Sequence, residues 1–335
     1  MRDAHRSSPA SPDSQGAPMD PHPPTGTSAP AIVINPMSAG GETRRRWPEV
    51  EAALRDALGE FRPLFTERRG HATELARTAL REGARMVVAV GGDGTLNEVM
   101  NGFFEDDRPV APEAVLGILP LATGGDFIKT VGTSRKLAEA AHTLAHGTPR
   151  TIDIGRLQYV QHDGTPAQRY FINIASFGIG GLVDRYVNQS HKLLSGKASF
   201  FLATVRASLH YKNARCRITL DDGPAIQQPI YVVAVSNGRF FGGGMKIAPD
   251  AEMDDGQFDV VTIGDVSMMS MILHSSRIYR GTHIGLPQVA AQRARKVVAE
   301  PVDAGVEVLL DVDGEAPGRL PATFELLPRA LRIQV

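Results

Sequence analysis

Residues 86–102 constrain the fold of this 335-residue chain more than any other stretch. An unbroken apolar run at 86–90 stops in Gly91-Gly92-Asp93-Gly94, and a helix-like pattern follows as far as Met100. A strand without polar alternation is typical of a parallel sheet covered on both faces. Glycines between a strand and a helix allow positive φ and close approach of a ligand. The bare amides at such a helix N-terminus indicate a phosphate-binding turn.

The elements expected along the chain divide it into two parts of different class. Up to about residue 150, strands alternate with helices, which predicts an α/β domain with a Rossmann-like parallel sheet. The expected strands are 31–34, 61–65, 86–90 and 115–119, and the helices are 43–58, 71–81 and 135–146. Further on, strands follow one another and predict an antiparallel β-sandwich. They are expected at 151–160, 169–177, 214–220, 229–236, 257–263, 294–300, 306–311 and 323–327, with helices at 182–189, 197–212 and 267–280.

We therefore predict a nucleotide-binding domain over 31–150 and a β-sandwich substrate domain over 151–321, with residues 322–335 returning to the first domain. Two domains of different class imply a cleft between them, where ligands favour binding. Residues 1–30 contain seven prolines and no Ile, Leu, Val or aromatic residue, so we expect a disordered tail.

Composition excludes several classes of function. The formal net charge of −1 gives no reason to expect nucleic acid as a partner. The single cysteine, Cys216, excludes an intramolecular disulfide and a multi-cysteine metal site, which fits a cytoplasmic protein. No apolar run reaches the roughly 18 residues that a membrane span needs. We expect a cytoplasmic protein that contacts at most the inner face of the membrane.

Asp93 is unexpected in a phosphate-binding turn, because its carboxylate would repel a phosphate held by the same amides. The charge is useful if Mg²⁺ lies between the two groups, or if Asp93 steers an attacking hydroxyl. A purely structural interpretation is also open. In that case Asp93-Gly94 is an ordinary turn and Thr95-x-x-Glu98 is a capping box for the helix.

Several separated motifs resemble those of the diacylglycerol kinase catalytic-domain superfamily, which includes bacterial lipid kinases, sphingosine kinases and ceramide kinases. GGDGTLNEVMNG at 91–102 is similar to its nucleotide-binding motif, and NPMSAGG at 35–41 to its Asn-Pro-x-Ser-Gly loop. PLATGGDF at 120–127 is similar to Pro-x-Gly-Thr-x-Asn-Asp-Phe, with Ala122 and Gly125 replacing the usual glycine and asparagine. The resemblance covers nearly everything from Ala31 onward and implies the fold shared by NAD kinases and diacylglycerol kinases.

The resemblance also implies roles for individual residues. Glu315, in DVDGE at 311–315, matches the carboxylate that accepts the proton of the lipid hydroxyl, with Asp93 as the second candidate for that role. The turn at 252–259 matches a structural Mg²⁺ site, with a side-chain oxygen of Asp255 and backbone oxygens of Glu252 and Gln257 as ligands. The residues expected to contact ATP are Asn35, Ser38, Thr66, Gly91, Gly92, Asp93, Gly94, Thr95, Leu96, Asn97 and Thr123.

The resulting hypothesis is an ATP- and Mg²⁺-dependent kinase that phosphorylates a hydroxyl of diacylglycerol or a related lipid. Ala122 and Gly125 motivate one alternative, a regulatory protein that binds nucleotide without catalysis. NAD kinases share the Gly-Gly-Asp-Gly turn and form a second alternative, disfavoured here because Asn97-Glu98 follows the turn directly.

The expected partners are a lipid substrate and, transiently, a membrane surface, whereas a homodimer remains open. The helices at 197–212 and 267–280 combine apolar residues with flanking bases, which suits a membrane interface. Packing of both helices on the sandwich is the simpler interpretation.

Overall fold

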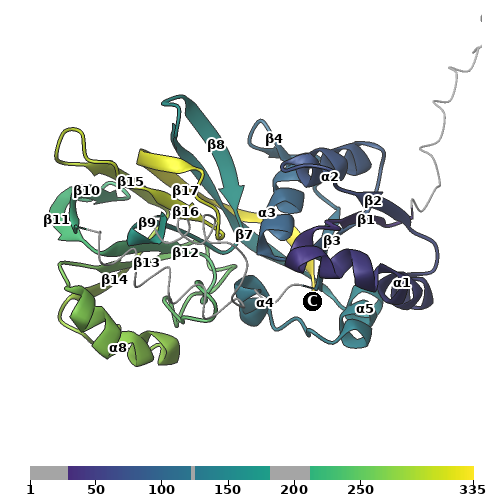
Figure 1. Ribbon diagram of the computed structural model, residues 1–335. Coiled ribbons are helices and arrows are strands. Elements are labelled where there is room, and N and C mark those ends of the chain that lie inside the picture. Colours follow the sequence, from purple (N-terminus) through teal and green to yellow (C-terminus); the bar gives the residue numbers. More distant parts are fainter. Residues whose placement is uncertain (1–28, 122–124, 182–211) are drawn as a thin grey trace, which may run out of the picture.

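The computed structural model describes residues 29–121, 125–181 and 212–335, and these form two lobes (Figure 1). The tail expected at 1–30 lies outside the described residues except for its last two positions. The helices expected at 182–189 and 197–212 also lie outside them, apart from Lys212 at the end of the second.

The first lobe is a parallel sheet between two layers of helices, as the sequence predicts. Its strands are ordered β2 (Arg62–Phe65), β1 (Ala31–Ile34), β3 (Met86–Gly91) and β6 (Val115–Pro120). One face packs against α1 (Ser38–Leu58) and α5 (Leu137–His146). The other packs against α2 (His71–Arg81), α3 (Asp93–Gly102) and α4 (Asp126–Val131), and β4 (Phe104–Glu105) pairs with β5 (Arg108–Pro109) beyond α3. Because side chains alternate along a strand, Val88 and Val90 face the first layer and Val87 and Ala89 the second.

The second lobe is a sandwich of two mainly antiparallel sheets. One sheet contains β11 (Ile226–Ile230), β10 (Ala214–Leu220), β15 (Lys296–Pro301), β17 (Gly318–Gln334), β7 (Pro149–Gln161) and β8 (Pro166–Phe171). The other is ordered β14 (Val289–Ala294), β13 (Phe258–Ile263), β12 (Val232–Ser236), β9 (Ile174–Gly178) and β16 (Leu310–Val312). Their inner faces enclose a core with stacked and edge-on rings of Phe171, Phe177, Phe258 and Phe324. Helix α8 (Met268–Arg280) packs on the outer face of the five-stranded sheet (Figure 1).

A single ten-stranded sheet runs through both lobes. Along β17, pairing with β7 extends from Gly318 opposite Gln161 to Gln334 opposite Pro149. Near its end, β17 also pairs in parallel with β6 of the first lobe, at Arg332 and Ile333. The residues expected to return to the first domain therefore belong to the same strand that crosses the sandwich.

Two strands expected as single runs are each divided in the structure. The run at 169–177 forms β8 and β9, because the backbone N–H groups between them donate to the carboxylate of Asp313. The run at 229–236 forms β11 and β12, which lie in different sheets on either side of Tyr231. Neither run contains an internal Gly or Pro that would mark where the chain changes partners.

Candidate active site where the lobes meet

Two strand-to-helix turns meet at the carboxyl ends of the parallel strands. Strands β2 and β3 lie on opposite sides of β1, and ligands of open α/β sheets bind at such a switch point. Asn35 follows β1, and its Nδ2 donates to Oγ1 of Thr95 in α3 at 3.1 Å. Thr66 follows β2 at the same edge, where its backbone N–H donates to Ile34 O at 2.9 Å. The structure thus brings together residues expected to contact nucleotide from three different strands.

The turn after β1 is an open loop of polar groups. Oγ of Ser38 donates to Asn35 O at 2.9 Å and contacts the hydroxyl of Thr43. Ala39, Gly40 and Gly41 all have positive φ, so the regular part of α1 begins only after them. This agrees with the helix start expected at residue 43.

None of Gly91, Gly92 and Gly94 has positive φ, which corrects the expectation from the sequence. A Cβ on Gly91 would lie 2.6 Å from Oγ1 and 2.8 Å from Cβ of Thr95, so space requires glycine there. Gly92 is extended, with φ −106° and ψ −172°. A Cβ on Gly94 would lie 3.7 Å from Oε1 of Glu315, which belongs to the other lobe, and would make an ordinary contact. Gly91 thus lets the N-terminus of α3 pack tightly on its own strand.

The capping-box interpretation of Thr95 and Glu98 is wrong. Thr95 lies inside α3, where its hydroxyl accepts the hydrogen bond from Asn35. The carboxylate of Glu98 instead accepts from the backbone N–H groups of Gly70 at 2.9 Å and Ala72 at 3.2 Å. Glu98 thereby caps the N-terminus of α2. Its partner lies in a different helix, and local spacing cannot reveal that.

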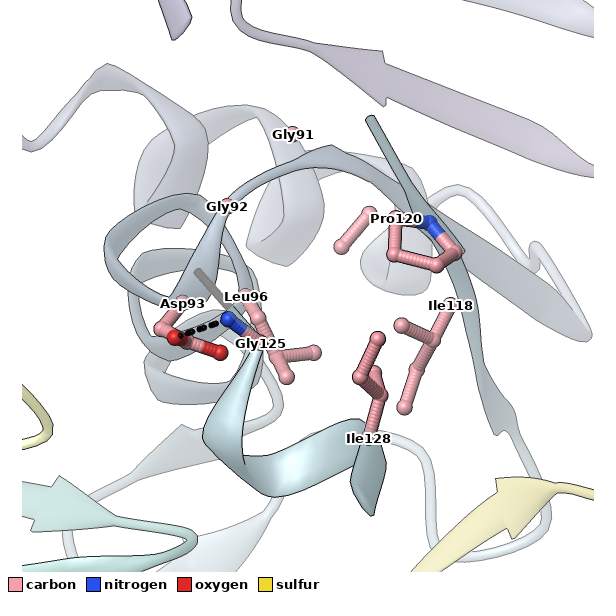
Figure 2. A pocket seen from close by; sticks show the side chains of 9 residues that line it. Gly91, Gly92, Asp93, Leu96, Ile118, Pro120, Gly125 and Ile128 are labelled. Atoms are coloured by element: carbon pink, nitrogen blue, oxygen red, sulfur yellow. Dashed lines mark hydrogen bonds between the residues drawn. The ribbon is translucent and has the colours of Figure 1, made fainter. Parts of the chain in front are cut away.

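Asp93 begins α3 and is directed toward the start of α4 (Figure 2). Its Oδ2 accepts from the backbone N–H groups of Gly125 at 2.7 Å and Asp126 at 3.3 Å. Burial raises the pKa of Asp93; the N–H of Gly125 opposes this shift, and the negative charge of Asp126 adds to it. A small pocket adjoins this carboxylate, lined by Ala89, Gly91, Gly92, Asp93, Leu96, Ile118, Pro120, Gly125 and Ile128.

The first residue of α4 connects this turn to the second lobe. The carboxylate of Asp126 accepts from Lys129 Nζ at 2.5 Å and from the N–H of Gly243 at 2.7 Å. Gly125, which replaces the family's asparagine, has φ 96° and supplies its backbone N–H to Asp93. Thr123 and the substituted Ala122 lie outside the described residues.

Asn97 and Asp313 join the two lobes through a buried hydrogen bond. Asp313 and Gly314 have φ of 50° and 86°, as expected for an Asp-Gly hairpin turn. The buried carboxylate of Asp313 accepts from Asn97 Nδ2 at 2.7 Å and from the three successive backbone N–H groups of residues 172–174. Burial raises the pKa of Asp313, and the hydrogen bonds oppose that shift. Asn97 is fully buried, and both the nitrogen and the oxygen of its side-chain amide form hydrogen bonds within the protein.

Glu315 follows this turn and lies between two arginines. Its Oε1 is 2.9 Å from Nη2 of Arg69, and its Oε2 is 3.1 and 3.2 Å from the two terminal nitrogens of Arg169. The side chain of Glu315 is 18% exposed, so part of it remains accessible to solvent. Arg69 precedes α2 and Arg169 belongs to β8, distant from any motif. Sequence reasoning missed both residues because only the tertiary fold brings them to Glu315.

The turn at 252–257 offers donors that fit a cation. Oδ1 of Asp255 accepts from the N–H of Gln257 at 3.0 Å, whereas its Oδ2 has no hydrogen bond and lies 3.1 Å from Nη1 of Arg293. Oδ2 of Asp259 is also buried without a hydrogen bond. Glu252 is exposed, so only its backbone oxygen is a natural ligand. Among residues 29–121, 125–181 and 212–335, no three His, Cys, Asp or Glu side chains cluster to hold a metal. A cation here would therefore depend on backbone oxygens and water, as Mg²⁺ often does.

Two family models together account for most of the chain. The diacylglycerol kinase catalytic domain matches residues 30–157, and the YegS C-terminal NAD kinase beta sandwich-like domain matches residues 173–335. The chain is 30% identical over 306 residues to a diacylglycerol kinase of Staphylococcus haemolyticus (strain JCSC1435), covering 90% of this chain and 86% of the relative. It is 29% identical over 304 residues to a diacylglycerol kinase of Bacillus subtilis (strain 168), covering 90% and 94%.

The fold is that of solved structures from Bacillus anthracis str. Sterne. A crystal structure of a diacylglycerol kinase superimposes with a TM-score of 0.65 at 20% identity, over 92% of this chain and 96% of that chain. A second crystal structure from that organism superimposes with a TM-score of 0.70 at 23% identity, over the same shares.

Proposed function

The chain belongs to the diacylglycerol kinase catalytic-domain superfamily, and from that premise we propose that it transfers the γ-phosphoryl group of ATP to a lipid hydroxyl. Diacylglycerol is the first acceptor to test, because the relatives are named for it. The observation that carries the proposal is the approach of Glu315 to the N-terminus of α3, where the position of a Gly94 Cβ is 3.7 Å from Oε1. An acid from one lobe thus meets the phosphate-binding turn of the other.

The nucleotide would lie across the turns after β1 and β3. The backbone amides at the start of α3, from Gly92 to Thr95, have no partner within the helix and suit phosphate oxygens. Asn35, Ser38 and Thr66 border the same edge of the sheet and suit the rest of the nucleotide. Asn97 and Thr95 support the turn from beneath, since their side chains bond protein groups.

Glu315 would accept the proton of the lipid hydroxyl as the new O–P bond forms. An alcohol has a pKa far above neutrality, so this proton moves late in the transfer. Arg169 fixes the Glu315 carboxylate with two N–H groups, and Arg69 holds its other oxygen. Asp93 is positioned to face the phosphate end of the nucleotide. A Mg²⁺ bound with ATP supplies neutralisation of the phosphate charge.

The turn at 252–257 would hold a second Mg²⁺ in a structural role. Asp255 provides the side-chain ligand, and Glu252 and Gln257 provide backbone oxygens. The two buried aspartate oxygens without hydrogen bonds support this assignment. No step of the transfer passes through this ion.

The proposal is tested by incubating the purified protein with labelled ATP and a panel of diacylglycerol, ceramide, sphingosine and phosphatidylglycerol. We expect label in a lipid product and a fall of at least about 100-fold for Asp93→Asn. ATP binding without label in any lipid would instead indicate a regulatory nucleotide-binding protein. In a parallel reaction with NAD in place of lipid, label in the dinucleotide would indicate an NAD kinase.

A further inference from the structure

Helix α8 presents an apolar stripe to solvent. Its inner side packs on the five-stranded sheet through Met271 and the buried Ile278. Its outer side carries large apolar side chains that are 69%, 42% and 75% exposed, at Met269, Ile272 and Leu273. Residues i, i+3 and i+4 lie on one face of a helix, so these three form a single surface. The largest apolar patch on a protein surface is often a site of contact with a partner or a membrane.

The same stripe becomes basic toward the end of the helix. Arg277 and Arg280 are exposed one to two turns after Leu273, and α8 contains no Asp or Glu. Neither guanidinium has an ion pair with any carboxylate in the part of the chain that the structure describes. An apolar patch bordered by these two arginines complements a surface with an apolar interior and an anionic outer layer.

The basic end of α8 is connected to the candidate active site. The N–H of Lys246 donates to Ile278 O at 3.1 Å, which ties the helix to the glycine-rich segment at 240–246. In that segment the N–H of Gly243 donates to Asp126, whose own N–H donates to Asp93. The negative charge of Asp126 also adds to the effect of burial in raising the pKa of Tyr279. The end of α8 is therefore connected to the segment that contacts the start of α4.

We propose that the outer face of α8, formed by Met269, Ile272, Leu273, Arg277 and Arg280, docks on a bilayer that contains anionic lipid. This inference rests on the proposed lipid kinase function, because docking would bring the cleft to acceptors in the membrane. A second copy of the chain fits less well. Three apolar side chains cover far less than the roughly 800 Å² per partner of a stable interface. Two such faces would also bring four arginines into one interface with no acid on either helix.

The test is co-sedimentation of the full chain with vesicles of phosphatidylcholine alone or mixed with phosphatidylglycerol. Wild type should bind the anionic vesicles, and more weakly as salt rises from about 0.1 to 0.5 M. Met269→Ser/Leu273→Ser should weaken binding at least about tenfold. Arg277→Gln/Arg280→Gln should weaken binding to anionic vesicles roughly 30-fold. Two control variants change exposed residues elsewhere and should bind as wild type does. They are Ile226→Ser/Val306→Ser for the apolar change and Arg85→Gln/Arg108→Gln for the charge change.

The docking inference is overturned if wild type ignores anionic vesicles, or if the α8 variants bind as well as wild type. It is also overturned if sedimentation velocity shows a wild-type dimer that the α8 variants lose. Activity on a short-chain, water-dispersed diacylglycerol separates this inference from the kinase proposal. The α8 variants should keep that activity. If the wild-type protein binds vesicles but does not phosphorylate the short-chain diacylglycerol, only the kinase proposal is contradicted.

Discussion

At the scale of single residues, Asp93 illustrates a conflict between function and stability. Its carboxylate is held in a half-buried position at the N-terminus of α3, and burial raises its pKa above the usual value. A raised pKa in the folded state means that the folded protein favours the protonated form. Deprotonation therefore costs folding free energy as the pH rises through that pKa. Functional sites commonly carry such a cost.

We predict that Asp93→Asn melts at a higher temperature than wild type at pH 7–8 while losing activity. The gain should shrink as the pH falls below about 4, where the aspartate is protonated in both the folded and unfolded states. Thermal melts of both proteins across this pH range provide the measurement. A variant that melts lower than wild type at pH 8 would show that the charge of Asp93 stabilises the fold.

The residue roles follow from the sequence only where a motif carries them. Asp93 and Glu315 can be located from their motifs, and in the structure Glu315 lies beside Gly94, the residue after Asp93. Arg169 and Arg69 cannot be located in this way, because their relation to Glu315 depends on strand and loop placement. The importance of Asp313 also escapes prediction, since its partners lie about 140 residues away along the chain.

At the scale of elements, the two glycines of the β3–α3 turn differ in how tightly they are packed. Gly91 packs against the buried Thr95, whereas Gly94 faces Glu315 with room for a Cβ. We predict that Gly91→Ala lowers the free energy of unfolding by about 1–3 kcal/mol, because Thr95 cannot move away. Gly94→Ala should keep or slightly raise that free energy, by up to about 1 kcal/mol, since alanine favours a helix. Urea titrations of the two variants form a matched pair, and equal effects would contradict this account.

The turn at 252–257 gives a prediction for metal removal. If Asp255 holds a Mg²⁺, chelation with EDTA should lower the melting temperature of wild type, and added Mg²⁺ should restore it. Asp255→Asn should melt near the chelated wild type and respond little to either treatment. A wild-type protein that melts at the same temperature with Mg²⁺ and with EDTA would show that Arg293 alone balances the charge of this turn.

At the scale of the whole molecule, β17 joins the two lobes through one sheet, from which we expect them to unfold together. It pairs with β7 over nearly its entire length and with β6 at its end. No helix in the described part of the chain combines the length and apolarity that a membrane crossing requires. The sequence predicts the class of both lobes, because strand and helix periods are local signals. It does not predict the shared sheet, which arises from pairing between strands far apart in the chain.

We predict that Ile333→Ala, in the end of β17, destabilises both lobes together by about 2–5 kcal/mol. Ile333 is fully buried in the core of the first lobe. Fluorescence of Trp47, the only tryptophan, reports that lobe, and circular dichroism reports the whole chain. The two melts should coincide and shift together. Arg332→Ala, which removes a surface ion pair with Glu113, should cost at most about 1 kcal/mol. Separate transitions would contradict a shared folding unit.

The most direct test of the central claim measures kcat and ATP affinity for Glu315→Gln beside wild type. If Glu315 receives the proton of the lipid hydroxyl while the α3 turn binds phosphate, kcat should fall about 100- to 10,000-fold. The Kd for ATP, measured by calorimetry, should change by no more than a few-fold, because the turn is left intact. Full phosphotransfer by Glu315→Gln, or loss of ATP binding together with activity, would contradict the account.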